Sequence, residues 1–143
     1  MSRFVLHHVV DPVAFLRAEA ARLRPGGVLI ACDQVSDPDP AAARWHQEIE
    51  CARDRSHVRN LTSGELVDAF GRAGLRGVRL EEDPFELDFD EWFDRGTPTL
   101  DKAEVRRRIL AGTARGFAPR NHDDGRISVR CLRALARGIR ADL

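Results

Sequence analysis

The first 33 residues alternate two short apolar runs with one amphipathic segment, and this order constrains the fold more than any other feature of the sequence. The first run starts at Phe4, and the second, residues 28–32, ends at Asp33. Short apolar runs without polar alternation are typical of strands buried on both faces of a parallel sheet. Between them, Asp11 and Pro12 supply an N-cap acceptor and a residue of fixed φ, which favour the start of a helix.

The segment between the two runs has the periodicity of a helix. Apolar residues recur at helical spacing after Pro12, and Pro25, Gly26 and Gly27 then end the helix, because proline cannot continue it and glycine accepts the left-handed cap. A strand, a helix and a second strand within about thirty residues predict a right-handed βαβ unit with two parallel strands.

The remaining sequence also mixes helical and strand patterns, so the predicted fold class is α/β. We expect a single domain over residues 1–143, made of the βαβ unit (1–36), a helical segment (37–75) and C-terminal strands and helices (76–143). Within it, helices are predicted at residues 37–54, 62–73, 89–94 and from 101, and strands through residues 78–80 and 127–139. The last strand is the most ambiguous, because residues 131–139 also fit a helix.

Composition excludes several classes of protein. Lys plus Arg and Asp plus Glu are both 23, so the net charge of zero gives no general reason to expect a nucleic acid or an anionic membrane as partner. No apolar run approaches the roughly 20 residues of a membrane span, and the first ten residues do not resemble a signal peptide. Three cysteines without a CxxC pair indicate reduced, buried thiols, and we expect a cytoplasmic protein.

Four segments, in order, resemble class I S-adenosylmethionine-dependent methyltransferases. Residues 23–29 (LRPGGVL) resemble the turn between a helix and a strand of that family, and residues 2–8 (SRFVLHH) resemble its fourth strand. Residues 33–36 (DQVS) follow the next strand. Residues 53–60 (RDRSHVRN), with Glu50 before them, resemble a signature of the ubiquinone/menaquinone methyltransferase subgroup.

The resemblance implies a partial Rossmann-like sheet. The family has seven strands in the order 3-2-1-4-5-7-6 and binds its cofactor across the ends of strands 1, 2 and 4. This sequence matches from the fourth strand onward, which leaves strands equivalent to 4-5-7-6 with flanking helices. It has no GxGxG, and its paired glycines, Gly26 and Gly27, lie at a different turn. The cofactor-binding half is therefore not among these residues.

A central strand left at an edge has a physical consequence. Its unpaired N–H and C=O groups would form a template for another strand, so we expect pairing along residues 3–9, from Arg3 to Val9. The partner would be a protein carrying the absent strands, as in a split methyltransferase, or a second copy related by a two-fold axis. A third alternative explains the absent strands without a partner: Met1 is not the natural first residue of the protein.

The candidate site residues follow predicted strands or lie in the RDRSHVRN segment. His7 and His8 end the first strand and Asp33 ends the second, so they can face one cleft at the carboxyl edge of the sheet. By resemblance, His7 would lie beside the cofactor and His8 beside the substrate. His8 and His57 are the candidate catalytic residues, which would orient or deprotonate the acceptor, and Asp54 is placed to set the tautomer of His57. The substrate-binding candidates are Asp33, Arg53 and Arg59, whose guanidinium groups suit an anionic group.

Each candidate also has a purely structural interpretation. One of the paired imidazoles could only cap the following helix, and the segment around His57 could be a hydrogen-bonded loop support. No metal site is expected, since His122 has no second ligand cluster at suitable spacing.

Two functions are consistent with these patterns. In the first, the chain is the substrate-side half of a methyltransferase for a small acceptor, with S-adenosylmethionine bound only in the completed assembly. The alternative is a non-catalytic subunit that binds a partner.

Overall fold

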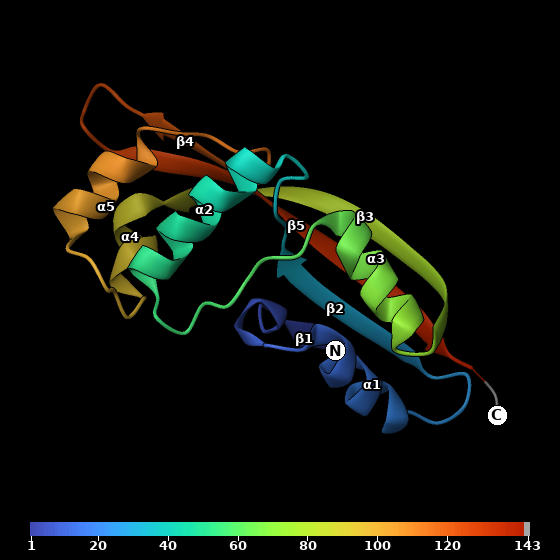
Figure 1. Ribbon diagram of the computed structural model, residues 1–143. Helices are drawn as coiled ribbons and strands as arrows, with labels where there is room; N and C mark the ends of the chain where they lie inside the picture. The colour runs from blue at the N-terminus through green and yellow to red at the C-terminus, as the bar shows by residue number, and fades with distance from the viewer. Residues whose placement is uncertain (142–143) are drawn as a thin grey trace. The chain divides into compact units, whose positions relative to one another are not determined.

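The computed structural model describes residues 1–141, and the chain divides into two compact units (Figure 1). Among the described residues, unit 1 contains 1–35, 59–83 and 133–141, and unit 2 contains 36–58 and 84–132.

The strands have the order predicted from the methyltransferase resemblance. Strand β1 (Ser2–Arg3) pairs in parallel with β2 (Val28–Gln34), and β2 pairs antiparallel with residues 133–139 of β5 (Ile127–Arg140). Strand β3 (Leu75–Asp88) lies on the other side of β5 and is hydrogen-bonded to it, so the spatial order of these strands in the sheet is β1-β2-β5-β3. This corresponds to 4-5-7-6, and the α/β fold class with a mixed sheet is confirmed. The final segment is a strand throughout and not a helix.

Two capped helices accompany the sheet of unit 1. Helix α1 (Pro12–Ala21) begins where the side chain of Asp11 accepts a hydrogen bond from the backbone N–H of Ala14 at 2.9 Å. Helix α3 (Ser63–Arg72) begins at the predicted capping box, in which Thr62 and Glu65 each accept the other's backbone N–H. The helices pack against each other (Figure 1) and bury Leu16, Ala20, Leu66, Ala69 and Phe70.

The first strand is much shorter than predicted. β1 ends at Arg3, Phe4 has a positive φ of 50°, and Leu6–His8 form the short 3-10 helix η1. A left-handed residue cannot continue a strand, and the side chain of Asp33 then accepts the backbone N–H of His7, which stabilises the turn. The prediction of a strand over residues 3–9 is therefore wrong. The observed strand β1 consists of Ser2 and Arg3, so Arg3 is the one residue that the predicted and observed strands share.

The prediction that β2 is buried on both faces is also wrong. Leu29, Ala31 and Asp33 are buried on one face, but Val28 is 46% exposed and the intervening residues are half-buried. Apolar residues on an antiparallel ladder do not require two covered faces, because such sheets commonly have one face toward solvent.

Unit 2 has a core of its own. It contains α2 (Pro40–Arg53), α4 (Phe89–Asp94), α5 (Lys102–Ile109) and the hairpin of β4 (Phe117–Asn121) with residues 127–131 of β5. Asp39, Asp88 and Asp101 cap the three helices. The core is aromatic and aliphatic, and its fully buried residues include Ile49, Phe89, Val105, Ile109, Phe117 and Val129.

The three thiols differ in burial and form no disulfide. Cys131 is fully buried, whereas Cys32 and Cys51 are only half-buried, so the expectation of three buried thiols holds for one of them. Within residues 1–141, no helix has the length and apolar character needed to cross a membrane.

Candidate functional site

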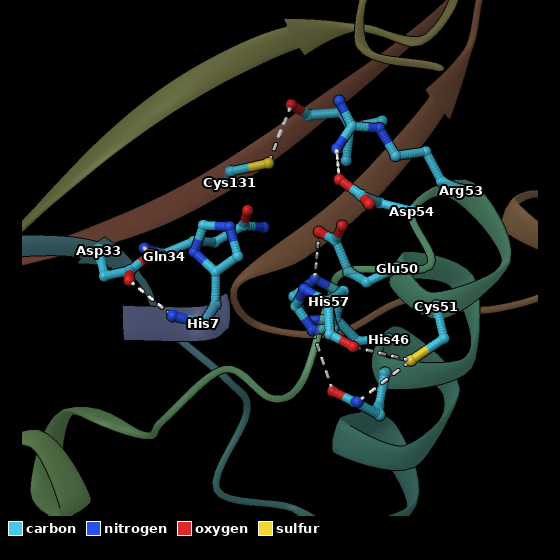
Figure 2. A network of polar contacts seen from close by, with 12 residues as sticks. His7, Asp33, Gln34, His46, Glu50, Cys51, Arg53, Asp54, His57 and Cys131 are labelled. Carbon is cyan, nitrogen blue, oxygen red and sulfur yellow. Dashed lines mark hydrogen bonds and ion pairs between the residues drawn. The ribbon is translucent and has the colours of Figure 1, made fainter. Parts of the chain in front are cut away.

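In unit 1, His7 and Asp33 are brought together from different elements. His7 lies in η1, directly after β1, and Asp33 lies near the carboxyl end of β2, so the parallel pairing of the two strands places them at the same edge of the sheet. The Nδ1 atom of His7 is 2.6 Å from Oδ1 of Asp33, and the backbone N–H of His7 donates to Oδ2 at 3.0 Å (Figure 2). The carboxylate therefore contacts both the backbone and the ring of one residue.

The surroundings of Asp33 fix which nitrogen of His7 carries a proton. Asp33 is only 4% exposed, and its Oδ1 also accepts the backbone N–H of Gln34 at 2.8 Å. An ionised carboxylate only accepts hydrogen bonds, so Nδ1 of His7 donates and Nε2 carries the lone pair of the neutral ring. This is the arrangement in which a carboxylate orients a histidine for proton transfer.

His8 and Arg59 lie beside this pair. His8 is exposed, and its ring centroid is 4.1 Å from that of His7. The backbone N–H of Arg59 donates to the carbonyl of His7 at 3.1 Å, while its guanidinium donates to Glu65 at 2.8 Å. Four of the predicted site residues, His7, His8, Asp33 and Arg59, are thus brought together in unit 1.

An open groove of about 520 Å³ lies between the start of α1 and one side of α3, along which it extends to Arg72, the last residue of that helix. Arg59 is one of the residues that line it. The other lining residues are Val10, Asp11, Pro12, Val13, Leu61, Glu65, Asp68, Ala69 and Arg72. The volume of the groove is in the range of small-molecule sites. Its first lining residue, Val10, comes two residues after η1, which contains His7.

In unit 2, His57 is held by a residue that the sequence analysis did not consider. His57 is 8% exposed, and its Nε2 is 3.1 Å from Oε1 of Gln47 on α2. The expected partner, Asp54, contacts the backbone of His57, since its carbonyl accepts the N–H of His57 at 3.1 Å. The side chain placed at Nε2 of the ring is that of Gln47.

The carboxylate of Asp54 has other partners. It accepts hydrogen bonds from the backbone N–H and hydroxyl of Ser56 and from the hydroxyl of Thr97. Burial by itself would raise the pKa of Asp54, but these hydrogen bonds and the charge of Arg53 outweigh it and lower the pKa to about 2. Asp54 therefore stabilises the turn at residues 54–58.

Arg53 is engaged with α4. Its Nε donates to the carbonyl of Trp92 at 2.8 Å, its guanidinium lies over the Trp92 ring at 5.1 Å, and Nη1 is 3.5 Å from Asp54. A side chain at Gly96 would collide with Arg53. These contacts hold the guanidinium against the protein.

Glu50 and His46 form a pair on α2 in which both side chains are buried. They are 4% and 1% exposed, and Nε2 of His46 is 3.3 Å from Oε1 of Glu50 (Figure 2). Burial would raise the pKa of Glu50, but the hydrogen bond from His46 and the charges of His46, His57 and Arg53 lower it. The i, i+4 spacing of the two residues could have indicated this contact. Across residues 1–141, no three metal-ligating side chains are close enough together to hold a metal ion.

With this geometry established, comparisons with known proteins identify the family. A family model described as a methyltransferase domain matches residues 1–80, more than half of the sequence. The chain belongs to this methyltransferase domain family. The match includes His7, Asp33, His57 and Arg59, and it begins at the strand that the resemblance equated with strand 4.

Individual proteins are similar to this chain in sequence or in fold. An uncharacterised Escherichia coli protein, YafE, is 40% identical over 95 residues, which are 66% of this chain and 46% of that protein. The crystal structure of Bacillus subtilis YcgJ has a TM-score of 0.85 at 22% identity and covers 99% of this chain and 63% of that one. A Haemonchus contortus phosphoethanolamine N-methyltransferase, solved with S-adenosylhomocysteine, has a TM-score of 0.52 at 12% identity, with coverage of 98% and 32%. The chain thus spans less than two thirds of each of these proteins.

Proposed function

We propose that this chain forms the acceptor-side part of an S-adenosylmethionine-dependent methyltransferase. The observation that carries the proposal is the His7–Asp33 pair, which lies at the carboxyl ends of β1 and β2 in a chain of the methyltransferase domain family. Open α/β sheets bind their ligands at this edge. The cofactor is proposed from the family and from the distant relative solved with S-adenosylhomocysteine.

The residues of this chain do not fit the nucleotide part of that cofactor. Such a site uses glycines with left-handed backbone in the turn that follows a strand. Gly26 and Gly74 do have positive φ, but they precede β2 and β3 at the opposite ends of those strands. Of the other glycines with positive φ, Gly77 lies within β3 and Gly125 lies in a hairpin. The strands that hold the nucleotide are therefore proposed to belong to a segment other than residues 1–141.

The proton of the acceptor has a defined destination in this proposal. A hydroxyl or amine that becomes methylated must lose its proton, and Nε2 of His7 is the nitrogen that takes it. The resulting imidazolium is stabilised by Asp33, whose Oδ1 stays bonded to Nδ1. We assign His7 this role in place of a contact with the cofactor, and His8, exposed beside it, orients the acceptor.

The arginines have different parts in the proposal. Arg59 lines the groove near the His7 turn and is placed to bind an anionic group of the acceptor. Its guanidinium would then share its hydrogen bonds between the acceptor and Glu65, with which it forms an ion pair. Arg53 is held by Trp92 and Asp54 and supports α4. The similarity of residues 53–60 to the ubiquinone/menaquinone subgroup supports a small acceptor.

We further propose that the cofactor-binding strands pair along β1. The residues that take part would be Ser2 and Arg3, and the strands would belong either to the same polypeptide or to a separate chain.

Methyl transfer by the completed enzyme tests the proposal. The chain would be joined to, or mixed with, a segment that carries a strand–GxGxG–helix unit, and transfer of labelled methyl to candidate hydroxyl and amine acceptors would be measured. We expect His7→Gln to abolish most of the transfer and the control His122→Gln, in the β4–β5 hairpin, to leave it unchanged. Full transfer by His7→Gln would contradict the assigned base, and no transfer by any completed assembly would contradict the function.

A further inference from the structure

Gln47 has an amide orientation that its partners determine. Its Nε2 donates to the carbonyl of Val58 at 2.5 Å and to Sγ of Cys51 at 3.3 Å. A carbonyl oxygen can only accept a hydrogen bond, so the nitrogen of the amide must face Val58. The amide oxygen must then face His57, whose Nε2 is 3.1 Å away.

This orientation fixes the protonation of the His57 ring. An amide oxygen only accepts, so the hydrogen bond between Gln47 and His57 requires a proton on Nε2. We propose that Gln47 is a positioning residue that holds His57 in its Nε2–H tautomer, so that Nδ1 is the nitrogen that gains or loses a proton. The chemistry available to His57 is thereby limited to one side of its ring.

The backbone around His57 is held by the same residues. Gln47 binds the carbonyl of Val58, the residue after His57, and the backbone N–H of His57 donates to the carbonyl of Asp54. The side chain of Gln47 therefore spans from α2 to the turn and contacts both the ring and the main chain. Gln47 is half-buried on α2, next to the buried His46.

His7 provides the opposite case in the same chain. Its Nδ1 donates to Asp33, so its neutral ring is the Nδ1–H tautomer, whereas that of His57 is the Nε2–H tautomer. Two histidines in opposite tautomers would present different nitrogens for proton transfer. The part that His57 has in methyl transfer rests on the proposed function, but its tautomer does not.

Nitrogen NMR tests the proposal directly. The 143-residue chain would be labelled with ¹⁵N-histidine, and two-bond ¹H–¹⁵N correlations would be recorded at a pH where His57 is neutral, with assignments from His57→Gln and His7→Gln. We expect a pyrrole-type Nε2 and a pyridine-type Nδ1 for His57, and the reverse for His7. A pyridine-type Nε2 in His57 would overturn the proposal.

Variants at Gln47 separate positioning from general support of the fold. Gln47→Met removes the acceptor, and the His57 signals should move to values averaged between the two tautomers, while the His7 signals stay unchanged. Gln47→Glu keeps an acceptor for Nε2–H and should restore the wild-type tautomer, although it cannot donate to Val58. An unchanged His57 spectrum in Gln47→Met would contradict the proposal. These results do not depend on methyl transfer, so they distinguish this inference from the proposed function.

Discussion

The carboxylate of Asp33 binds His7 twice, once through the backbone N–H and once through the ring nitrogen Nδ1 at 2.6 Å. A single buried side chain on β2 therefore fixes both the path of the chain after β1 and the orientation of the adjacent imidazole. The local turn and the proposed proton acceptor depend on the same carboxylate.

This relationship predicts a loss of stability in Asp33→Asn. The carboxylate accepts three hydrogen bonds, two from His7 and one from Gln34, and an amide nitrogen cannot accept any of them. At least one buried N–H loses its partner, which should lower the free energy of unfolding by about 1–3 kcal/mol. Urea denaturation measures the change. The control Asp68→Asn alters an exposed carboxyl on α3 and should change it by less than about 0.5 kcal/mol.

Asp54 should make stability depend on pH in the acid range. Its pKa in the folded chain is about 2, below the ordinary value of 3.8, so the folded state favours the ionised form. The contribution is therefore complete well above pH 3.8 and is lost as the pH falls toward 2. Asp54→Asn should remove this part of the acid dependence, as measured by urea denaturation from about pH 2 to about pH 6. An identical acid dependence in both proteins would refute this role.

Two glycines should respond in opposite ways to substitution by alanine. A Cβ at Gly112 would overlap the ring of Trp45, so Gly112→Ala should destabilise the protein by about 1–3 kcal/mol. Gly71 lies in α3, and a Cβ added there would meet no atom within 4 Å, so Gly71→Ala should stabilise by about 0.5–1 kcal/mol. Thermal denaturation of the two variants side by side checks both signs.

The three thiols should react with alkylating reagents at different rates. Cys131 is 0% exposed, and burial raises its pKa strongly, so both access and thiolate formation are suppressed. Cys32 and Cys51 are half-buried, and burial raises the pKa of each less severely. Iodoacetamide labelling followed by mass spectrometry should modify these two in the native protein and Cys131 only in denaturant. Native labelling of Cys131 at a comparable rate would be inconsistent with this core.

Local signals in the sequence were sufficient for most elements. The Asp11–Pro12 start and the Thr62–Glu65 capping box are each satisfied within a few residues, and both correspond to observed helix starts. The expected end of α1 at Pro25, Gly26 and Gly27 is wrong, because the helix already ends at Ala21 with Arg22 as its C-cap. The strand order followed from the family resemblance, since the pairing of β2 with β5 joins residues about a hundred positions apart.

Contacts between distant residues account for what the sequence did not show. The early end of β1 depends on Asp33, which is 26 residues beyond His7, and apolar residues 4–6 carry no sign of it. Gln47 and His57 are ten residues apart, and their contact requires both α2 and the turn to be formed. Asp54, closer to His57 in sequence, accepts its backbone N–H, whereas the contact with Nε2 of the ring is made by Gln47.

Calorimetric titration with S-adenosylhomocysteine tests the central claim most directly. The claim is that these 143 residues supply the acceptor side of a methyltransferase and lack the nucleotide-binding half. The account predicts no measurable binding by this chain alone and saturable binding, with one site, once a strand–GxGxG–helix segment is joined to it or added. Tight binding by the 143-residue chain alone, or none by any completed assembly, would contradict it.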